Sequence, residues 1–163
     1  MAAKKKKKKG EGDGHIVARN RRATFDYHID EQFEAGMMLT GTEVKSLREG
    51  RASINEAYAG QDDGEIWLFN AYIPEYSHAS HKMNHPEKRN RKLLLHKREI
   101  ARIIGALQNR GITLVPMRIF FNRRGLAKII VGIGRGKREI DKRQVKKDRD
   151  WNRQKSRLLR DRG

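Results

Sequence analysis

The chain has 163 residues, contains no cysteine and carries a formal net charge of +18 at pH 7. The absence of cysteine excludes disulfides, thiolate catalysis and cysteine-ligated zinc, and it is compatible with a cytoplasmic location. No apolar run approaches the roughly 20 residues that span a bilayer, and the lysine-rich start lacks the apolar segment of a secretory signal. Because cations placed on phosphates release condensed counterions, this charge predicts a polyanionic partner. An anionic membrane surface is the alternative, but no amphipathic anchor supports it.

The positive charge is concentrated at the two ends. Residues 1–14 contain six lysines and two acidic residues, and residues 134–163 contain thirteen lysines and arginines against five acidic residues. We therefore expect a disordered lysine-rich arm over residues 1–14, one RNA-binding domain over residues 15–133 and a basic tail over residues 134–163.

Early in the domain, a strand and a short helix are expected after a short basic lead-in. Residues 25–29 alternate between apolar and polar side chains, which predicts a half-buried strand. Residues 41–50 predict a helix with Thr42 as its N-cap. This helix would present Lys45 and Arg48 on an outer face, where both could contact RNA.

The rest of the domain predicts two hairpins around one clear helix. Residues 56–73 contain an Asp-Gly turn pair between β-branched and aromatic residues, and residues 112–133 form a second such pair of strands. Residues 74–91 are polar and predict a loop, whereas residues 96–111 carry isoleucines and leucine at helical spacing. The pattern predicts a mainly β fold: an oligonucleotide-binding-type closed antiparallel β-barrel with flanking short helices and a disordered basic C-terminal tail.

The glycine-rich stretch at residues 132–138 resembles a nucleotide-binding loop only superficially. A Walker loop requires glycine where this chain has Val131, and serine or threonine where it has Arg138. We expect the glycines to end a strand without side-chain bulk, so that the backbone, Lys137 and Arg138 can approach phosphates.

No constellation of residues indicates metal binding or catalysis. His78, His81 and His85 have spacings compatible with metal ligation, but no carboxylate cluster completes a site, so polar loop histidines are the favoured interpretation. Asp62 and Asp63 are explained better by a turn than by acid–base chemistry. We expect no enzymatic activity, no metal and no cofactor.

Two side chains admit a binding interpretation. Glu34, at the end of a predicted strand, could accept a hydrogen bond from a base amino group, although pairing with a neighbouring arginine is favoured on periodicity alone. Leu94 lies between two other leucines, and all three could belong to the core. In an extended segment, however, Leu94 would face outward, where it could contact an unpaired base or ribose.

The tail combines dense positive charge with a narrow apolar stripe. Val145, Trp151 and Leu158 are spaced at about two helical turns, and Leu159 lies beside the last of them. Such a stripe does not offset the entropy of ordering the segment in water. We expect the tail to be disordered alone and to become helical where phosphates neutralise it.

Three stretches together resemble the bacterial small protein B family: NRRATFDYHIDEQFEAGMMLTGTEVKSLREG, RKLLLHKREI and GKREIDKR. The resemblance implies a β-barrel that binds the transfer-RNA-like domain of transfer-messenger RNA in trans-translation, the rescue of stalled ribosomes. It further implies delivery of this RNA to the decoding centre of the small subunit, with elongation factor Tu as an indirect partner through the charged RNA. We expect a monomer without membrane contact.

The same resemblance assigns roles to individual residues. In the domain, Glu34, Leu94 and Lys128 match RNA-contacting positions, and a basic lead-in beside them comprises Asn20, Arg21 and Arg22. In the tail, the positions implied to act in the empty mRNA channel are Asp141, Lys142, Arg143, Trp151, Leu158 and Leu159. Many members have histidine where this chain has Ile140.

Two other functional classes remain as alternatives. If the protein were a structural component of the ribosome that coats ribosomal RNA, its positive charge would account equally well for two basic ends on a small β domain. An enzyme acting on RNA is the third interpretation, and it lacks a catalytic constellation.

Overall fold

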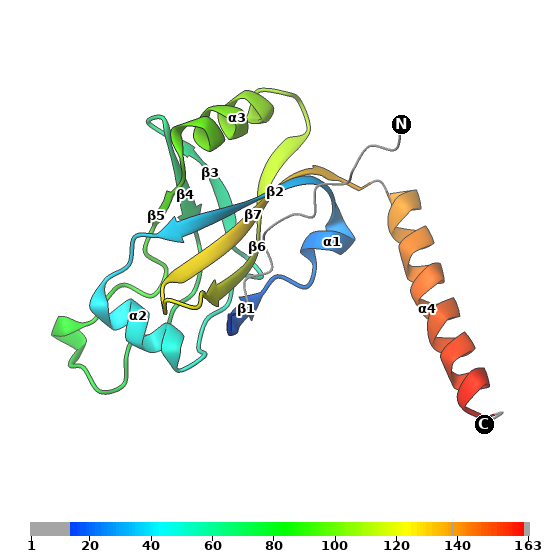
Figure 1. Cartoon of the computed structure of the whole chain (residues 1–163), viewed down its shortest axis with the longest axis horizontal. Coiled ribbons are helices and arrows are strands. Elements are labelled where there is room, and N and C mark those ends of the chain that lie inside the picture. The colour runs from blue at the N-terminus through cyan, green and yellow to red at the C-terminus, as the bar shows by residue number, and fades with distance from the viewer. Residues whose placement is uncertain (1–13, 138, 162–163) are drawn as a thin grey trace.

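The computed structural model describes residues 14–137 and 139–161, with short helices around a curved sheet and one long helix beside it (Figure 1). The strands are β1 (Ile16–Arg19), β2 (Tyr27–Met37), β3 (Tyr58–Asp62), β4 (Glu65–Phe69), β5 (Arg91–Leu94), β6 (Ile112–Phe121) and β7 (Ala127–Gly136). The helices are α1 (Ala23–Asp26), α2 (Gly41–Arg48), α3 (Lys97–Leu107) and α4 (Glu139–Asp161), with a 3-10 turn η1 (His81–Met83).

The seven strands form one antiparallel sheet in the order β1-β6-β3-β4-β5-β2-β7. Because β7 also pairs with β6, the order returns on itself, and six strands follow one another around a ring. The seventh strand, β1, pairs with the later part of β6. A mainly β, antiparallel fold with short helices is thereby confirmed.

The principal core fills the inside of this ring. Alternate strand residues point inward, so that Leu68 of β4, Leu93 of β5, and Ile129 and Val131 of β7 are fully buried. Helix α3 adds Ile103 to the same cluster. Each such side chain contributes about 1.5–3 kcal/mol to stability through removal of apolar surface from water.

Strands β6 and β7 are buried on their outer face as well. There Met117, Phe120 and Ile130 form a second cluster with Ala23 of α1. At Gly132, an added Cβ would lie only 2.8 Å from Cγ2 of Ile29, so glycine is what lets Ile29 pack over β7. The short helix α1 therefore covers one outer face of the sheet.

The first two glycines of the glycine-rich run serve this packing. Gly132 and Gly134 are buried inside β7, and only Gly136 is at its end, so the prediction that these glycines end a strand holds for Gly136 alone. Lys137 follows the strand, and its Nζ donates a hydrogen bond to the Thr24 carbonyl at 2.7 Å. Arg138 lies outside the described residues.

Two predicted boundaries are wrong near the start of the domain. Residues 25–29 do not form one strand, because Phe25 belongs to α1 and β2 begins at Tyr27. The N-cap of α2 is Thr40 rather than Thr42. The Thr42 hydroxyl instead makes a 2.9 Å hydrogen bond with Nδ1 of His85. In both places, contacts with distant parts of the chain override the local pattern.

The expectation of a disordered tail is also wrong for this structure, in which Glu139–Asp161 form the continuous helix α4. These residues include neither glycine nor proline and are rich in lysine, arginine and glutamine, which are good helix formers. Gln144 also donates to Asp148, four residues later, at 3.2 Å. The prediction weighed only the apolar stripe and neglected this intrinsic propensity. Among the described residues, no helix combines the length and apolar character needed to cross a membrane.

Candidate nucleic-acid interface

Three predicted contact residues meet around one glycine on the outer face of the ring. Gly36 of β2 pairs with Leu94 of β5 on one side and with Lys128 of β7 on the other. An added Cβ at Gly36 would lie 3.2 Å from Cβ of Leu94 and 3.7 Å from Nζ of Lys128. Glu34 lies two residues before Gly36 and therefore shares its face. The missing side chain at Gly36 lets Leu94 and Lys128 approach each other across β2.

At this place Glu34 and Leu94 are exposed, and Lys128 is half-buried. Leu94, the last residue of β5, is 49% exposed, whereas its neighbour Leu93 is fully buried. Within the described part of the chain, neither Glu34 nor Lys128 has an ion-pair partner, so the favoured pairing of Glu34 with a neighbouring arginine is absent. A carboxylate, an ammonium group and an apolar side chain are thus free to contact a base, a phosphate and a ribose, respectively.

The predicted lead-in residues divide into one structural and two surface residues. The amide of Asn20 is fixed on β6, because its Nδ2 donates to the Pro116 carbonyl at 3.1 Å. Arg21 is exposed, and Arg22 lies 3.6 Å from Asp26 in a surface ion pair. These residues stand beside α1 rather than beside Gly36.

The predicted helix residues lie on α2, which follows the Gly36 end of β2. Lys45 is exposed, and its ammonium lies 5.5 Å from the ring centre of Tyr76 in a cation–π contact. Arg48 is exposed at the last turn of the helix. Both cations are available to phosphates from this end of the sheet.

A buried ionic cluster, which was not predicted, connects α2 to β5. Glu43 and Arg91 are fully buried, and Glu43 accepts hydrogen bonds of 2.6 Å from both Arg91 and Arg89. Arg91 also donates to the Ala71 carbonyl at 2.7 Å. Because strand residues alternate, holding Arg91 inward turns Leu94 outward. The only local signal was the Thr-x-x-Glu spacing from Thr40, which suggests a helix cap rather than an ionic core.

The charge state of this cluster follows from its contacts. Burial by itself would raise the pKa of Glu43, but the hydrogen bonds and charges of Arg89 and Arg91 outweigh it and hold this pKa below its ordinary value. Glu43 is therefore ionised at neutral pH and binds both arginines.

The loop histidines act as structural residues where their contacts are visible. His85 is buried, and its ring bridges Thr42 and the Ile73 carbonyl through two 2.9 Å hydrogen bonds. His81 lies 2.7 Å from Glu75 at the surface. Over residues 14–137 and 139–161, no three metal-ligating side chains come together.

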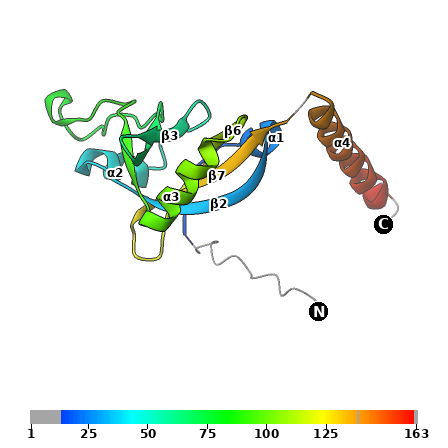
Figure 2. The same ribbon diagram turned by 90° about the horizontal axis from the view of Figure 1, so that it is seen from above.

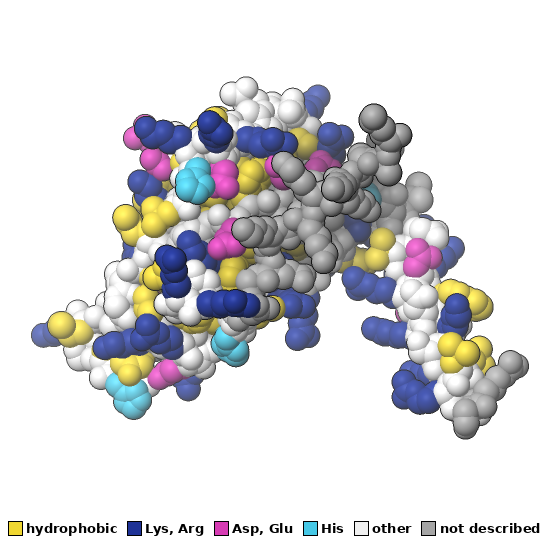
Figure 3. All heavy atoms as spheres, viewed as in Figure 1, with side chains coloured by type: hydrophobic (Ala, Val, Ile, Leu, Met, Phe, Trp, Pro, Cys, Tyr) yellow, Lys and Arg dark blue, Asp and Glu magenta, His cyan; other side chains and the backbone are white. Residues whose placement is uncertain are grey.

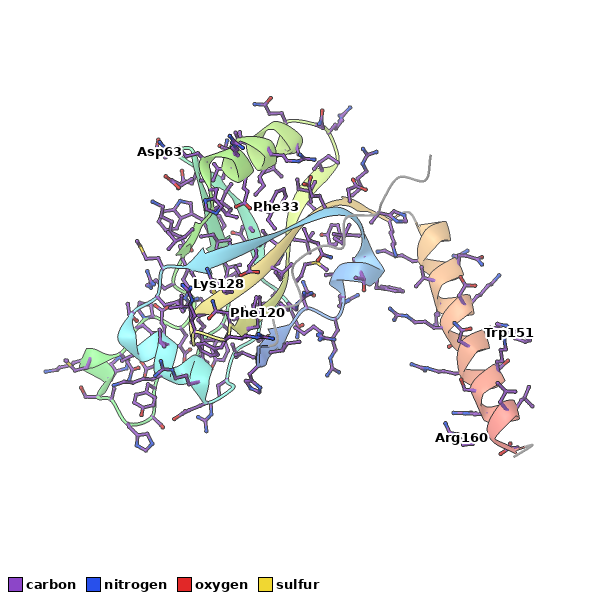
Figure 4. All side chains as sticks on the ribbon, viewed as in Figure 1. Phe33, Asp63, Phe120, Lys128, Trp151 and Arg160 are labelled. Atoms are coloured by element: carbon purple, nitrogen blue, oxygen red, sulfur yellow. The ribbon has the colours of Figure 1, made fainter. Side chains whose placement is uncertain are left out.

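The tail residues lie on α4, next to α1 (Figure 2). Lys142 is 3.4 Å from Asp26, and Arg143 is exposed. Trp151 and Leu158 are 62% and 61% exposed, and Trp151 lies on the side of α4 away from the body (Figure 4). Leu159 is exposed as well, whereas the side chains of Ile140 and Asp141 are outside the described part of the structure.

Fold and site together define a basic, mainly β nucleic-acid-binding protein. Comparison with known sequences narrows this class: residues 17–161 match the family model described as SmpB protein. An SsrA-binding protein of Azorhizobium caulinodans is 54% identical over the full length of both chains. One from Methylobacterium nodulans is 57% identical over 148 residues, covering 91% of this chain and 94% of the relative.

Comparison with solved structures points to the same family. A chain in the structure described as "tmRNA-SmpB: a journey to the center of the bacterial ribosome" is 49% identical, with a TM-score of 0.62. The match covers 74% of this chain and 84% of that chain. This chain belongs to the SmpB family.

Proposed function

We propose that this protein is a non-enzymatic, cytoplasmic RNA-binding adaptor of trans-translation. It binds the transfer-RNA-like domain of transfer-messenger RNA and delivers that RNA to stalled ribosomes. The observation that carries the proposal is the meeting of Glu34, Leu94 and Lys128 around Gly36 on an exposed strand face. The relatives are SsrA-binding proteins, and the solved relative is described with transfer-messenger RNA and the ribosome, which supports this assignment.

In this proposal, the ring of strands is an oligonucleotide-binding-type closed barrel over residues 15–133, and its outer face recognises folded RNA. Lys128 neutralises a phosphate, Leu94 packs on an exposed base or ribose, and Glu34 accepts a hydrogen bond from a base amino group. Lys45 and Arg48 extend the contact along the backbone from α2. The buried Glu43–Arg91 pair fixes the strand that presents Leu94.

The tail acts on the ribosome. It enters the mRNA channel only when no message fills it, because a cationic helix then meets free phosphates on the channel wall. Arg143 and the exposed apolar residues Trp151, Leu158 and Leu159 supply contacts that the body lacks. Asp141 and Lys142 stand at the start of the helix, where the channel would begin.

The first test is to isolate the protein from cells and sequence the RNA that accompanies it. We expect one dominant RNA that ends in a transfer-RNA-like domain. A broad mixture of ribosomal RNA fragments would instead indicate a structural ribosomal component, and one copy per ribosome after a high-salt wash would confirm that alternative. Incubation with RNA and Mg²⁺ is expected to give no cleavage, and turnover would identify an enzyme.

A further inference from the structure

An arginine pair on β1 and β6 has no anionic partner among the residues that the structure describes. Arg19 and Arg118 are directly opposite each other in the antiparallel ladder. Their neighbours Ala18 and Ile119 point into the core, so both arginines point to the outer face. Within the described part of the chain, neither arginine has an acidic partner. Like charges directly opposite across two strands repel each other, so this pair favours an anion between them.

The surroundings add positive charge to this pair. A hollow of about 1170 Å³ is lined by Arg19, Arg118 and Arg21, together with Arg149 from α4. A neighbouring hollow of about 400 Å³ lies between α1 and α4, and its cations comprise Arg21, Arg22, Lys146, Arg149 and Arg153. Asp150 is the acidic residue that lines it. The two hollows share Arg21 and Arg149, and we refer to them together as the cleft between the body and the tail; apart from Asp150, the charged residues that line it are all cations.

Helix α4 turns its cations toward this cleft. Lys146, Arg149 and Arg153 follow the spacing of one helix face, and Arg149 lies 5.8 Å from the ring centre of Phe25. Trp151 lies on the opposite face. Figure 3 shows lysine and arginine side chains along the side of α4 near the body, whereas the apolar side chains, with further cations between them, lie on the far side.

The arginine pair lies close to the interface around Gly36. Ile130 of β7 pairs with Glu34 on one side and with Arg118 on the other. Because adjacent strands are about 4.8 Å apart, Arg118 lies only about 10 Å from Glu34 along the same outer surface. The arginine pair is therefore within reach of an RNA that is bound at Glu34.

We propose that the Arg19–Arg118 pair and the cleft beside α4 bind the phosphodiester backbone of the same RNA that contacts Glu34. The inference rests on the proposed function in taking this RNA as the polyanion, and it adds Arg19, Arg118 and Arg149 to the binding surface. Phe25, which is half-buried in the hollow beside α4, offers a ring on which a ribose or base can lie, so the cleft suits a nucleic-acid strand rather than an isolated phosphate ion.

The test measures the affinity of the full chain for a transfer-RNA-like domain RNA at increasing KCl concentrations. The double variant Arg19→Gln/Arg118→Gln is compared with Lys82→Gln/Lys88→Gln, which removes the same charge from the loop beside η1, at the other end of the body from α4 (Figure 1). We expect the first variant to make the negative slope of log K against log salt shallower by about 1.4 to 1.8, corresponding to two lost phosphate contacts. The control variant should keep the wild-type slope. Equal slopes for the two variants would overturn the proposal.

A second comparison separates binding from folding. Arg118→Glu places an acid opposite Arg19, so we expect its thermal midpoint to exceed that of Arg118→Gln while its RNA affinity falls below it. Equal affinities would mean that no phosphate approaches this position, and the inference would fail.

The two proposals fail in different ways. If the wild type binds the transfer-RNA-like RNA no more tightly than a hairpin of equal length, the proposed function is wrong. Whether the cleft binds an RNA backbone is then decided by measuring the salt dependence of hairpin binding for the same two double variants. A shallower dependence for Arg19→Gln/Arg118→Gln than for the control would support the cleft.

Discussion

At the scale of single residues, specificity and stability depend on different carboxylates. Glu34 is exposed and unpaired among the described residues, whereas Glu43 is fully buried and accepts from two arginines. An unpaired surface carboxylate in a chain of net charge +18 repels RNA phosphates unless it contacts a specific donor. In the proposed function Glu34 therefore provides selectivity, whereas Glu43 holds the strand that carries Leu94.

Replacing Glu34 tests selectivity directly. We expect Glu34→Ala to weaken binding to the transfer-RNA-like domain by about 1–3 kcal/mol, or roughly 5-fold to 150-fold, because a base donor loses its acceptor. Glu56→Ala removes an equal charge from an exposed turn and should leave the affinity unchanged or slightly raised. Gel-shift titration measures both, and an equal affinity for the two variants would remove Glu34 from the interface.

Replacing Glu43 tests how the buried ionic cluster contributes to stability at different pH values. The pKa of Glu43 is lower in the folded state than in the unfolded chain, so its stabilising effect is complete above the unfolded value of about 4.3. The effect is lost as the pH falls through the lower folded value. We expect Glu43→Gln to cost about 3–5 kcal/mol at pH 7, because two arginines lose their shared partner.

The matching measurement is urea unfolding between neutral and acid pH. The free energy of unfolding should fall less steeply with acid in Glu43→Gln than in the wild type. Parallel curves for the two proteins would contradict the depressed pKa.

At the scale of elements, the local pattern predicted those segments whose periodicity decides their structure. The helix expected over residues 96–111 contains α3, and the alternating strand at residues 127–133 lies inside β7. By contrast, β1 and α1 have no strong periodicity and form because β6 and its outer apolar cluster offer them a surface. The ionic contact of Glu43 with Arg91 joins residues 48 positions apart, and no local pattern contains it.

The candidate site, like the fold, could be predicted only in part from the sequence. Resemblance to a family named Glu34, Leu94 and Lys128, but only the register around Gly36 shows why they meet. The arginine pair at Arg19 and Arg118 depends on the pairing of two distant strands, so it could not be read from the sequence.

Helix α4 allows a test in which charge stays constant. Asn152→Pro interrupts the helix at its exposed middle and costs about 3 kcal/mol of local helix stability, whereas Asn152→Ala preserves it. If the tail acts as a helix, the proline variant should lose helical ellipticity and fail to tag peptides on stalled ribosomes, while the alanine variant tags normally. Normal tagging by both variants would mean that charge alone suffices.

At the scale of the whole molecule, body and tail are joined by few contacts. The ion pair of Lys142 with Asp26 and the contact of Arg149 with Phe25 are both at the surface, where such interactions contribute about 0–1 kcal/mol each. The stability of the body therefore depends little on the tail. A division of labour between RNA recognition by the body and ribosome engagement by the tail fits this architecture.

Deleting residues 141–163 tests that division. We expect the truncated chain to unfold at nearly the same urea concentration as the full chain and to bind the transfer-RNA-like domain through the contacts of the body, with only the small loss of affinity that removal of the α4 side of the cleft, including Arg149, causes. Tagging of stalled ribosomes should be lost. A truncated chain that tags normally would show that the tail has no role on the ribosome.

The opposed faces of α4 make its one tryptophan an optical reporter. Trp151 is exposed on the side away from the body, whereas Trp67 is half-buried on β4. The emission of Trp151 in the free protein is therefore that of an indole in water, and nucleobases stacking on it would quench it. Following that emission in a Trp67→Phe background would time the arrival of the tail at its target independently of RNA capture by the body.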